Sequence, residues 1–183
     1  MEKRFKTTKL KNKPKIIVIT GAESTGKTTL AKRLADHFSA PYMPEIAREY
    51  VENLNHNYTF SDVETIARMQ IELFNKIIKN NARYIFIDTW LVITKIWFEF
   101  VYNKTPDWLI KELRLNKIDL FLVCDTNLPW IYDPVRENGG ANRNILQDKY
   151  IQNISNLGFN YKIISGIDDE RFNNAIQFIN ELQ

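Results

Sequence analysis

A chain of 183 residues with 44% hydrophobic content can bury one sizeable core, and no linker-like shift in composition divides it, so we expect one domain over residues 15–183. The formal net charge of +3 is concentrated in a basic arm at residues 1–14, which we interpret as a flexible, solvated tail in preference to a nucleic-acid contact. The chain has no signal-peptide core and no apolar run long enough to span a bilayer, which predicts a cytoplasmic protein without a membrane partner.

The first predicted strand, residues 15–20, leads directly into a glycine-containing loop. The stretch Gly21-Ala22-Glu23-Ser24-Thr25-Gly26-Lys27-Thr28 fits the pattern GxxxxGK[ST]. Apolar residues then recur at helical spacing from Leu30 to Phe38, so the loop passes from a strand into an amphipathic helix, as the pattern requires. In such a loop the backbone N–H groups face an anion, Lys27 reaches the β- and γ-phosphates of a nucleotide, and the Thr28 hydroxyl is placed to bind Mg²⁺. We therefore predict a phosphate-binding loop.

Two prolines shape the segment after the first helix. Because Pro41 and Pro44 disfavour helix, we expect only a short extended segment between residues 39 and 50. This segment brings three charged side chains close together, those of Glu45, Arg48 and Glu49. A capping-box pattern at residues 61–64 then predicts the start of a long amphipathic helix.

The rest of the chain alternates between short apolar runs and longer amphipathic stretches. We predict strands at residues 84–87, 118–124 and 161–164, an aromatic-rich helix at 89–102, a polar segment at 131–143, and a closing helix with acidic residues in its first turn. Alternating strands and helices imply right-handed crossovers and a parallel sheet covered on both faces. The single cysteine, Cys124, lies in an apolar run and is predicted to be a buried structural thiol.

Ligands of an open α/β sheet lie beyond the carboxyl ends of the strands, so the polar residues there are the candidates for chemistry. Asp88 and Asp125 each end an apolar run. The acid that holds Mg²⁺ beside the loop lysine and threonine in P-loop proteins lies at such a position. Either can instead be a turn or helix-cap acid. The sequence leaves the two in competition and favours Asp88, because Thr89 and Trp90 beside it can contact a substrate.

Two arginines make the polar segment a candidate lid. Arg136 and Arg143 are seven residues apart, so on a partly helical lid both would project from one side and neutralise charge on a transferring phosphoryl group. A solvated loop is the alternative. Trp130, just before this segment, is either a stacking surface for a flat ring or a packing residue.

Neither histidine is placed for general-base chemistry. His37 lies on the predicted loop helix, and His56 lies in a polar stretch. A base, if the reaction uses one, must therefore be a carboxylate, and the available ones are Glu45, Glu49 and Asp88.

Four stretches together resemble one protein family: GAESTGKTTL, PEIAREYV, FIDTWLVITK and DLFLVCDTNLPWIYDPVRENGG. They resemble the ribosylnicotinamide kinase domain of the NadR-type proteins, a branch of the P-loop nucleoside and nucleotide kinases, over nearly the whole chain. The resemblance implies an α/β, P-loop NTPase fold with a five-stranded parallel sheet and a lid. It also implies ATP and Mg²⁺ as co-substrates and transfer of the γ-phosphoryl group to the 5′-hydroxyl of nicotinamide riboside, which gives NMN in NAD salvage.

The resemblance, added to the motifs, gives each candidate residue a role. For the nucleotide these residues are Gly21, Glu23, Ser24, Thr25, Gly26, Lys27, Thr28, Thr29 and, in the turn before the last helix where such kinases wrap the adenine, Arg171. For the substrate they are Glu45, Arg48, Glu49, Tyr50, Thr89, Trp90 and Trp130. Thr28 and Asp88 would hold the metal, and Lys27, Glu45, Asp88, Arg136 and Arg143 would act in catalysis.

Two departures from the family pattern stand out. Trp90 occupies a position where many members carry a second acid, and nothing in this sequence resembles the HxGH motif of an adenylyltransferase, so adenylyl transfer is not expected.

Two further functions stay open: a kinase of the same fold that acts on a deoxynucleoside or nucleotide, and a regulatory module that uses the nucleotide as a switch. The sequence sets no oligomeric state.

Overall fold

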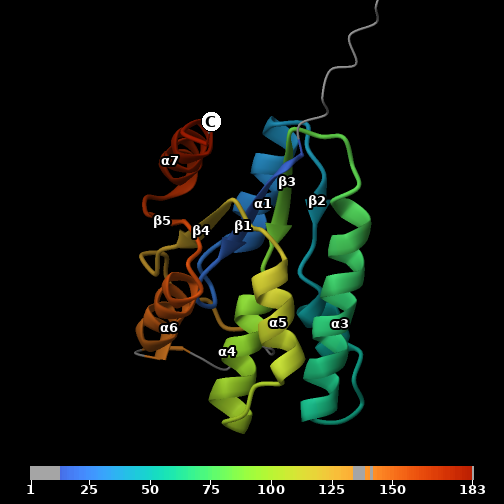
Figure 1. Ribbon diagram of the computed structural model, residues 1–183. Coiled ribbons are helices and arrows are strands. Elements are labelled where there is room, and N and C mark those ends of the chain that lie inside the picture. The colour runs from blue at the N-terminus through green and yellow to red at the C-terminus, as the bar shows by residue number, and fades with distance from the viewer. Residues whose placement is uncertain (1–12, 134–138, 141, 183) are drawn as a thin grey trace, which may run out of the picture.

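The structure, a computed structural model, describes residues 13–133, 139–140 and 142–182. Five parallel strands form one sheet in the order β2-β3-β1-β4-β5 (Figure 1). The strands are β1 (Lys15–Thr20), β2 (Tyr42–Met43), β3 (Tyr84–Asp88), β4 (Leu120–Cys124) and β5 (Tyr161–Ile164). The predicted α/β fold with a five-stranded parallel sheet is confirmed.

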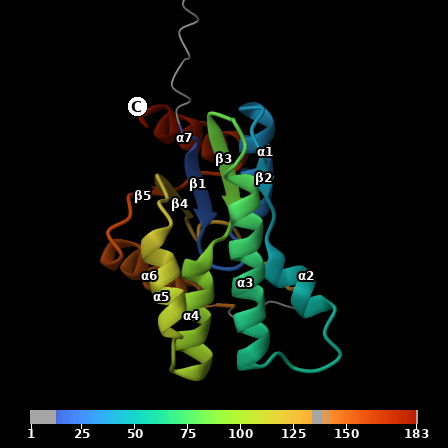
Figure 2. The ribbon, with the colours of Figure 1, turned by 45° about the vertical axis from the view of Figure 1, so that its right-hand side comes forward.

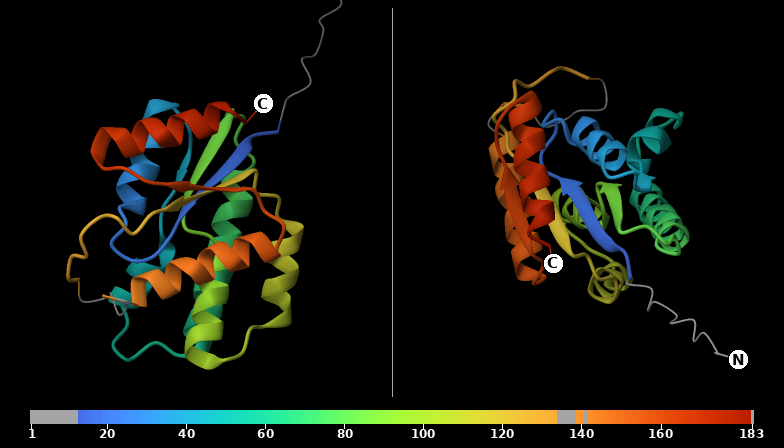
Figure 3. Two further views of the ribbon diagram at one scale, coloured as in Figure 1. Left: turned by 90° about the vertical axis from the view of Figure 1, so that its left-hand side faces the viewer. Right: turned by 90° about the horizontal axis from the view of Figure 1, so that it is seen from above.

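Helices cover the sheet on both sides because side chains of each strand alternate between its faces. They are α1 (Lys27–His37), α2 (Ile46–Glu52), α3 (Phe60–Ile77), α4 (Leu91–Tyr102), α5 (Asp107–Leu115), α6 (Asn142–Asn156) and α7 (Asp168–Asn180). Ile17 and Ile19 of β1 pack toward α1 and α7, whereas Ile16 and Val18 face α3 to α6. In the left view of Figure 3, α7 lies above the strands and α4, α5 and α6 lie below them. The sheet is therefore buried on both faces.

The segment after α1 differs from the prediction. We expected only extended chain before residue 50, but β2 is two residues long and helix α2 begins at Ile46, directly after Pro44 and Glu45. Proline blocks a helix that would run through it but not one that begins after it, so Pro44 ends the strand and permits α2. Figure 2 shows α2 standing beside α3, beyond the end of β2.

The predicted start of α3 is also corrected. The capping box is formed by Thr59 and Asp62, not by residues 61–64: the Thr59 hydroxyl accepts from the Asp62 N–H (3.3 Å), and Asp62 Oδ2 accepts from the Thr59 N–H (2.8 Å). The helix therefore begins at Phe60. Both ends of the box are satisfied because the acid lies three residues after the threonine.

The carboxyl ends of the strands meet at one end of the molecule. The arrowhead of β3 points down in Figure 1, and α7 ends at the opposite, upper end. Cys124, the last residue of β4, is fully buried, and burial raises the pKa of its thiol to about 11, which confirms the predicted structural thiol. None of the helices in the described residues has the length and hydrophobicity to cross a membrane.

Candidate active site

Two glycines allow the loop at residues 21–28 to leave β1 and enter α1. Gly21 has a φ of 131°, and a Cβ there would lie 2.7 Å from the carbonyl oxygen of Cys124. Gly26, the residue before α1, has a φ of 74°. Only glycine accommodates both the backbone conformation and the close approach to β4 at position 21. The pattern therefore predicts the conformation of the loop as well as its presence.

Cationic side chains bind three carbonyl groups of the loop. Lys27 Nζ donates to the carbonyl oxygen of Ala22 (2.9 Å), Arg143 Nη2 donates to that of Ser24 (3.3 Å), and Arg171 donates to that of Thr25. Two of these cations come from α6 and α7, more than a hundred residues along the chain. The loop conformation is therefore fixed by distant elements, and the positive charge that a polyphosphate needs is already in place.

Arg171 lies inside the first turn of α7, not in the turn before it as predicted. Its side chain is buried and also donates to the carbonyl oxygens of Gly166 (2.9 Å) and Asp125 (3.2 Å) and to the side chain of Asn127. The guanidinium group thus joins the loop to the segments that follow β4 and β5. Its predicted contact with adenine stays a prediction.

Gln147 of α6 holds the start of the loop, and no local sequence pattern indicates this role. Its Oε1 accepts from the Ala22 N–H (3.2 Å), and its Nε2 donates to the carbonyl oxygen of Cys124 (3.0 Å). The side chain is only 7% exposed. A buried glutamine that bridges β4 and the loop therefore provides hydrogen-bond partners for two backbone groups, the N–H of Ala22 and the carbonyl oxygen of Cys124.

Ser24 contacts a stretch that we call the bridging segment, residues 128–133. The Ser24 hydroxyl accepts from the Ile131 N–H (2.9 Å) and donates to the Pro129 carbonyl oxygen (3.4 Å). Ser24 has a φ of 56°, a left-handed conformation that costs a residue with a Cβ roughly 1 to 2 kcal/mol. The hydroxyl is therefore used within the protein, in addition to any contact with a nucleotide.

Asp88 lies beside the loop at the end of β3. Its carboxyl group is fully buried, and one oxygen, Oδ2, accepts from the Tyr42 hydroxyl (3.2 Å). Burial raises the pKa of Asp88, opposed by a hydrogen bond from Thr28, the charge of Lys27 and the bond from Tyr42. Oδ1 has no hydrogen-bond partner among the residues that the structure describes. The structure thus brings together Lys27, Thr28 and Asp88, as predicted, and adds Tyr42.

Asp125, the competing acid, serves a turn. Its Oδ1 accepts from the N–H of the next residue, Thr126 (2.7 Å), and its own N–H donates to Ile164 of β5 (2.9 Å). This is the turn role that the sequence left open for either acid. The geometry favours Asp88 for the site.

Arg48 lies on the side of α2 that contacts the bridging segment, and Glu45 directly precedes the helix. Arg48 Nη1 binds both carboxyl oxygens of Asp133 (3.0 and 3.1 Å) and Glu52 (3.2 Å). Burial, Asp88 and then the charge of Glu45 raise the pKa of Tyr42, whereas burial lowers the pKa of Arg48 and is outweighed by Asp133, Glu52 and the charge of Glu45. The bridging segment therefore contacts the loop through Ser24 and α2 through Arg48.

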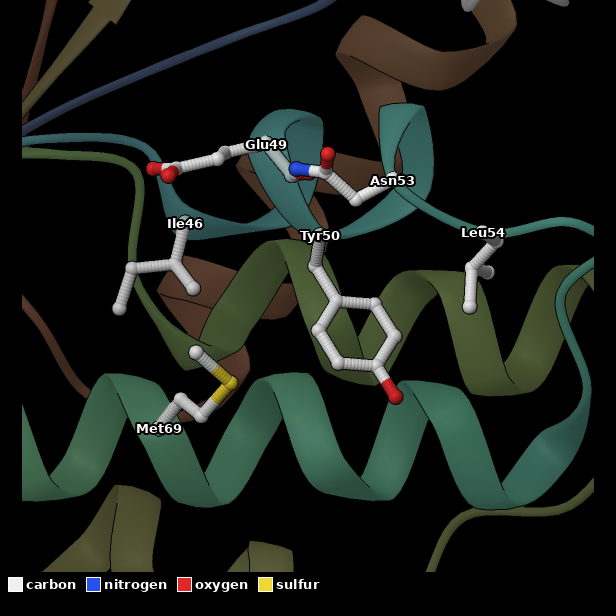
Figure 4. A pocket seen from close by; sticks show the side chains of 6 residues that line it. All are labelled: Ile46, Glu49, Tyr50, Asn53, Leu54 and Met69. Atoms are coloured by element: carbon white, nitrogen blue, oxygen red, sulfur yellow. The ribbon is translucent and has the colours of Figure 1, made fainter.

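Glu49 and Tyr50 line a cavity of about 360 Å³ that lies beside α2 and includes Met69 of α3. Its lining residues are Ile46, Glu49, Tyr50, Asn53, Leu54 and Met69. In Figure 4 the Tyr50 ring points toward α3, and Glu49 points away from that ring. The Tyr50 hydroxyl donates to Asp62 Oδ1 (3.0 Å), which raises the pKa of Tyr50. The predicted substrate residues of α2 are thus divided between this cavity and the contact with the bridging segment.

Thr89 and Trp90 are buried, in contrast to the substrate contacts expected of them. Trp90 is 1% exposed and its ring packs against Phe74 with centroids 4.4 Å apart, so its aromatic faces belong to the core. Thr89 is 1% exposed and has a φ of 63°, which a β-branched residue rarely adopts. Neither the Thr89 hydroxyl nor the Trp90 indole N–H has a hydrogen-bond partner in the described residues. A functional role of Thr89 therefore stays a prediction, motivated by its backbone strain at the end of a strand.

The lid prediction falls only partly within the described residues. Arg136 lies outside them. Arg143 belongs to the first turn of α6, is 7% exposed, and donates to the carbonyl oxygens of Leu128 (2.9 Å) and Ser24. It is therefore not the solvated loop residue that the alternative required. Trp130 packs close to Gly139, where a Cβ would lie 3.2 Å from its ring, so a packing role is seen and a stacking role stays a prediction.

The histidines lie where the sequence placed them. His37 is exposed at the end of α1, and His56 is exposed in the α2–α3 connection. A carboxylate therefore remains the available base. Within the described residues, no group of three or more His, Cys, Asp or Glu side chains could hold a metal ion by itself.

The chain is similar to several known proteins. A family model described as an AAA domain matches residues 16–171. The trifunctional NAD biosynthesis/regulator protein NadR of Salmonella typhimurium is 24% identical over 172 residues, and that of Escherichia coli is equally similar. The match covers 91% of this chain, which spans 42% of the length of these curated relatives.

Solved structures share the fold. NadR in complex with NR superposes with a TM-score of 0.71 at 22% identity, covering 94% of this chain and 52% of that one. Thymidylate kinase from Ehrlichia chaffeensis has a TM-score of 0.63 at 18% identity over 93% of this chain and 99% of that one. Deoxyadenosine kinase from M. mycoides has a TM-score of 0.60 at 12% identity over 91% and 99%. The architecture is that of P-loop kinases.

Proposed function

The chain belongs to the AAA domain family, and from this premise we propose that it is an ATP- and Mg²⁺-dependent kinase that phosphorylates the 5′-hydroxyl of nicotinamide riboside. The observation that carries the proposal is the buried carboxylate of Asp88, whose neighbours are Thr28 and Lys27 of the loop. A buried acid beside the loop lysine and threonine is the group that a site for a nucleotide with Mg²⁺ uses. A phosphotransferase needs one for its metal or for the attacking hydroxyl.

The residues at the loop fit a nucleotide-bound Mg²⁺. In P-loop enzymes a loop hydroxyl and a strand-end acid hold the ion, and here Thr28 and Asp88 would hold it. Asp88 Oδ1, which has no partner in the described part of the chain, offers an oxygen for the ion or its water. When bound, Mg²⁺ neutralises charge on the β- and γ-phosphates. Lys27, now on the carbonyl oxygen of Ala22, would move to those phosphates.

The reaction breaks the bond between the γ-phosphorus and the β,γ-bridging oxygen and forms a bond between that phosphorus and O5′ of the acceptor. The proton of the 5′-hydroxyl passes to a carboxylate. Asp88 and Glu45 are the candidates, because both approach Tyr42. A raised pKa makes Asp88 a better proton acceptor than an ordinary aspartate. Arg143 adds positive charge beside the loop, where charge moves in the transition state.

The choice of nicotinamide riboside rests on the relatives and on the chemistry of α2. One structural neighbour is NadR in complex with NR, and this chain is similar to NadR over most of its length. The cavity between α2 and α3 is lined by an aromatic ring, Tyr50, and a carboxylate, Glu49. A pyridinium cation gains from both groups, whereas a neutral base needs donors and acceptors aimed at its edge. We therefore assign this cavity, together with Glu45 and Arg48, to the acceptor side.

The decisive experiment measures phosphoryl transfer from ATP with Mg²⁺ to a panel of acceptors. We expect nicotinamide riboside to have a kcat/KM well above those of thymidine, deoxyadenosine and dAMP. Comparable values for a neutral nucleoside would replace the specific assignment with a deoxynucleoside kinase. Tight ATP binding without transfer to any acceptor would point instead to the nucleotide-switch module, with Lys27→Ala as the control that removes nucleotide binding.

A further inference from the structure

The bridging segment is hydrogen-bonded to the phosphate-binding loop through the Ser24 hydroxyl. Both oxygen atoms of Ser24 are hydrogen-bonded. The side-chain hydroxyl binds Pro129 and Ile131, and the main-chain carbonyl oxygen accepts from Arg143. Arg143 in turn donates to Leu128, the first residue of the bridging segment. We call this set of contacts among Ser24, the bridging segment and Arg143 the Ser24 junction.

The identity of residue 24 is unexpected on conformational grounds. Its φ of 56° is one that glycine adopts without penalty, whereas a residue with a Cβ is strained there. The loop already has glycine at positions 21 and 26, where φ is also positive. A serine at position 24 therefore keeps a backbone strain that glycine would remove. The hydroxyl bonds to the bridging segment are what the serine adds.

The Ser24 junction also connects the two sides of the site. Ser24 belongs to the loop, and the other end of the bridging segment reaches α2 through the ion pair between Asp133 and Arg48, with a shortest distance of 3.0 Å. This pair is partly exposed and contributes little by itself. Fixing residues 129 and 131 on the loop limits where Asp133 and Arg48 can lie.

From this geometry we propose that Ser24 is a positioning residue, which holds the bridging segment and the Arg143 guanidinium group in register with the phosphate-binding loop. Its hydroxyl acts on the reaction through Arg143 and through the relative placement of the loop and α2. The kinetic consequence rests on the proposed function, but the structural consequence does not. A change at Ser24 should lower the rate of transfer more than the affinity for the nucleotide, because the loop amides and Lys27 are unchanged.

The chain offers a matched control. Ser39, in the connection between α1 and β2, is exposed and has a φ of 48°, so Ser39→Gly also removes a hydroxyl from a left-handed serine. Ser24→Gly should lower kcat about tenfold or more while the Kd for a non-hydrolysable ATP analogue changes less than about twofold. Ser39→Gly should leave both values unchanged. Relief of the left-handed strain should keep the melting temperature of both variants at or above that of the wild type.

A second readout does not depend on turnover. In the wild type the Ile131 amide donates to Ser24, so its hydrogen exchange should be slow, and Ser24→Gly should accelerate it about tenfold. Ser24→Ala, which keeps the Cβ and loses the hydroxyl, should give the same acceleration. Unchanged exchange in both variants, or a wild-type kcat in Ser24→Gly, overturns the proposal. If the wild type transfers phosphate to no acceptor, the proposed function fails and the exchange of Ile131 alone decides on the Ser24 junction.

Discussion

The proposed donor side, the loop at residues 21–28, and the proposed acceptor side, helix α2, are held in different ways. The loop at residues 21–28 is bound by side chains from three directions: Lys27 within it, Arg143 and Gln147 from α6, and Arg171 from α7. Helix α2, in contrast, has no buried residue along its length. Its polar attachments are the partly exposed ion pair of Arg48 with Asp133 and the bond from Tyr50 to Asp62.

This difference separates chemistry from recognition. A loop that must place phosphates beside Lys27 and Asp88 loses rate if it shifts, so it is preorganised by buried polar contacts. A helix that lines an acceptor cavity can move at low free-energy cost, because few apolar contacts are broken when it does. We therefore expect changes on the donor side to act on kcat and changes on α2 to act on the KM of the acceptor.

The largest effect should come from Lys27. Lys27→Ala should lower kcat by about 10³-fold or more, because the charge that meets the β- and γ-phosphates is lost. The melting temperature should change little, since the side chain contributes nothing to the core. Steady-state kinetics and thermal unfolding measure the two effects, with the exposed Lys79→Ala as the control. Near-normal turnover would remove the kinase assignment and with it the distinction between the two sides.

Asp88 and Asp125 come next. Asp88→Asn should lower kcat by about 10²-fold or more, because it removes charge beside the metal or the attacking hydroxyl. Asp125→Asn should retain most of the activity, since Asp125 only completes a turn. The two variants should be compared in the same steady-state assay. The reverse order would move the catalytic acid from β3 to β4.

The arginines should have a smaller effect on the same parameter. Arg143→Ala and Arg136→Ala should each lower kcat by about tenfold to a hundredfold, with a smaller change in the KM for ATP, because their charge is needed most in the transition state. Single-turnover kinetics separates this step from product release. Wild-type turnover in both variants would contradict the assignment of these arginines to phosphoryl transfer.

The raised pKa of Asp88 predicts a pH-dependent gain in stability on its removal. A carboxyl group whose pKa is higher in the folded than in the unfolded state lowers stability as the pH rises from the unfolded-state value to the folded-state value, and the full loss is present above the folded-state value. Asp88→Asn should therefore unfold at a higher temperature than the wild type at pH 7. The difference should shrink as the pH falls toward the unfolded-state value of Asp. A variant less stable than the wild type at pH 7 would show that the contacts with Thr28 and Lys27 outweigh burial.

The smallest effect should be on the acceptor side. Glu49→Gln should raise the KM for nicotinamide riboside about two- to fivefold, because an exposed carboxylate attracts a cation only weakly, and it should leave the KM for ATP unchanged. A neutral nucleoside should be insensitive to the same change. An equal rise for charged and neutral acceptors would place the pyridinium ring elsewhere.

Much of the donor side could be predicted from the sequence because it is local. The loop pattern fixes Gly21, Lys27 and Thr28 within eight residues, and the end of an apolar run indicates Asp88. Gln147 and Tyr42 could not be found in this way. Gln147 acts through a contact with a loop more than a hundred residues away in the sequence, and Tyr42 lies on a strand only two residues long. A lone buried Gln or Tyr has no local sequence pattern.

The fold could be predicted where the hydrophobic periodicity was strong, and the prediction failed where a proline left the start of a helix ambiguous. The apolar runs of β1, β3, β4 and β5 specify a parallel sheet, which the structure confirms. Pro44 disfavours a helix that runs through it but commonly precedes one, and for this reason the prediction of extended chain misses α2. Trp90 was expected at the substrate because it follows Asp88, but its size and its neighbour Phe74 draw it into the core.

A helix without buried residues is also open to evolutionary change. Replacing the side chains of α2 alters the lining of the acceptor cavity without opening a hole beneath the sheet, so most substitutions there leave the fold intact. The loop has no such freedom, because a Cβ at Gly21 would collide with β4. Lineages built on this framework can therefore diverge in what they phosphorylate while the transfer chemistry is inherited unchanged. Residues 44–58 are the natural place to begin retargeting the protein to another acceptor.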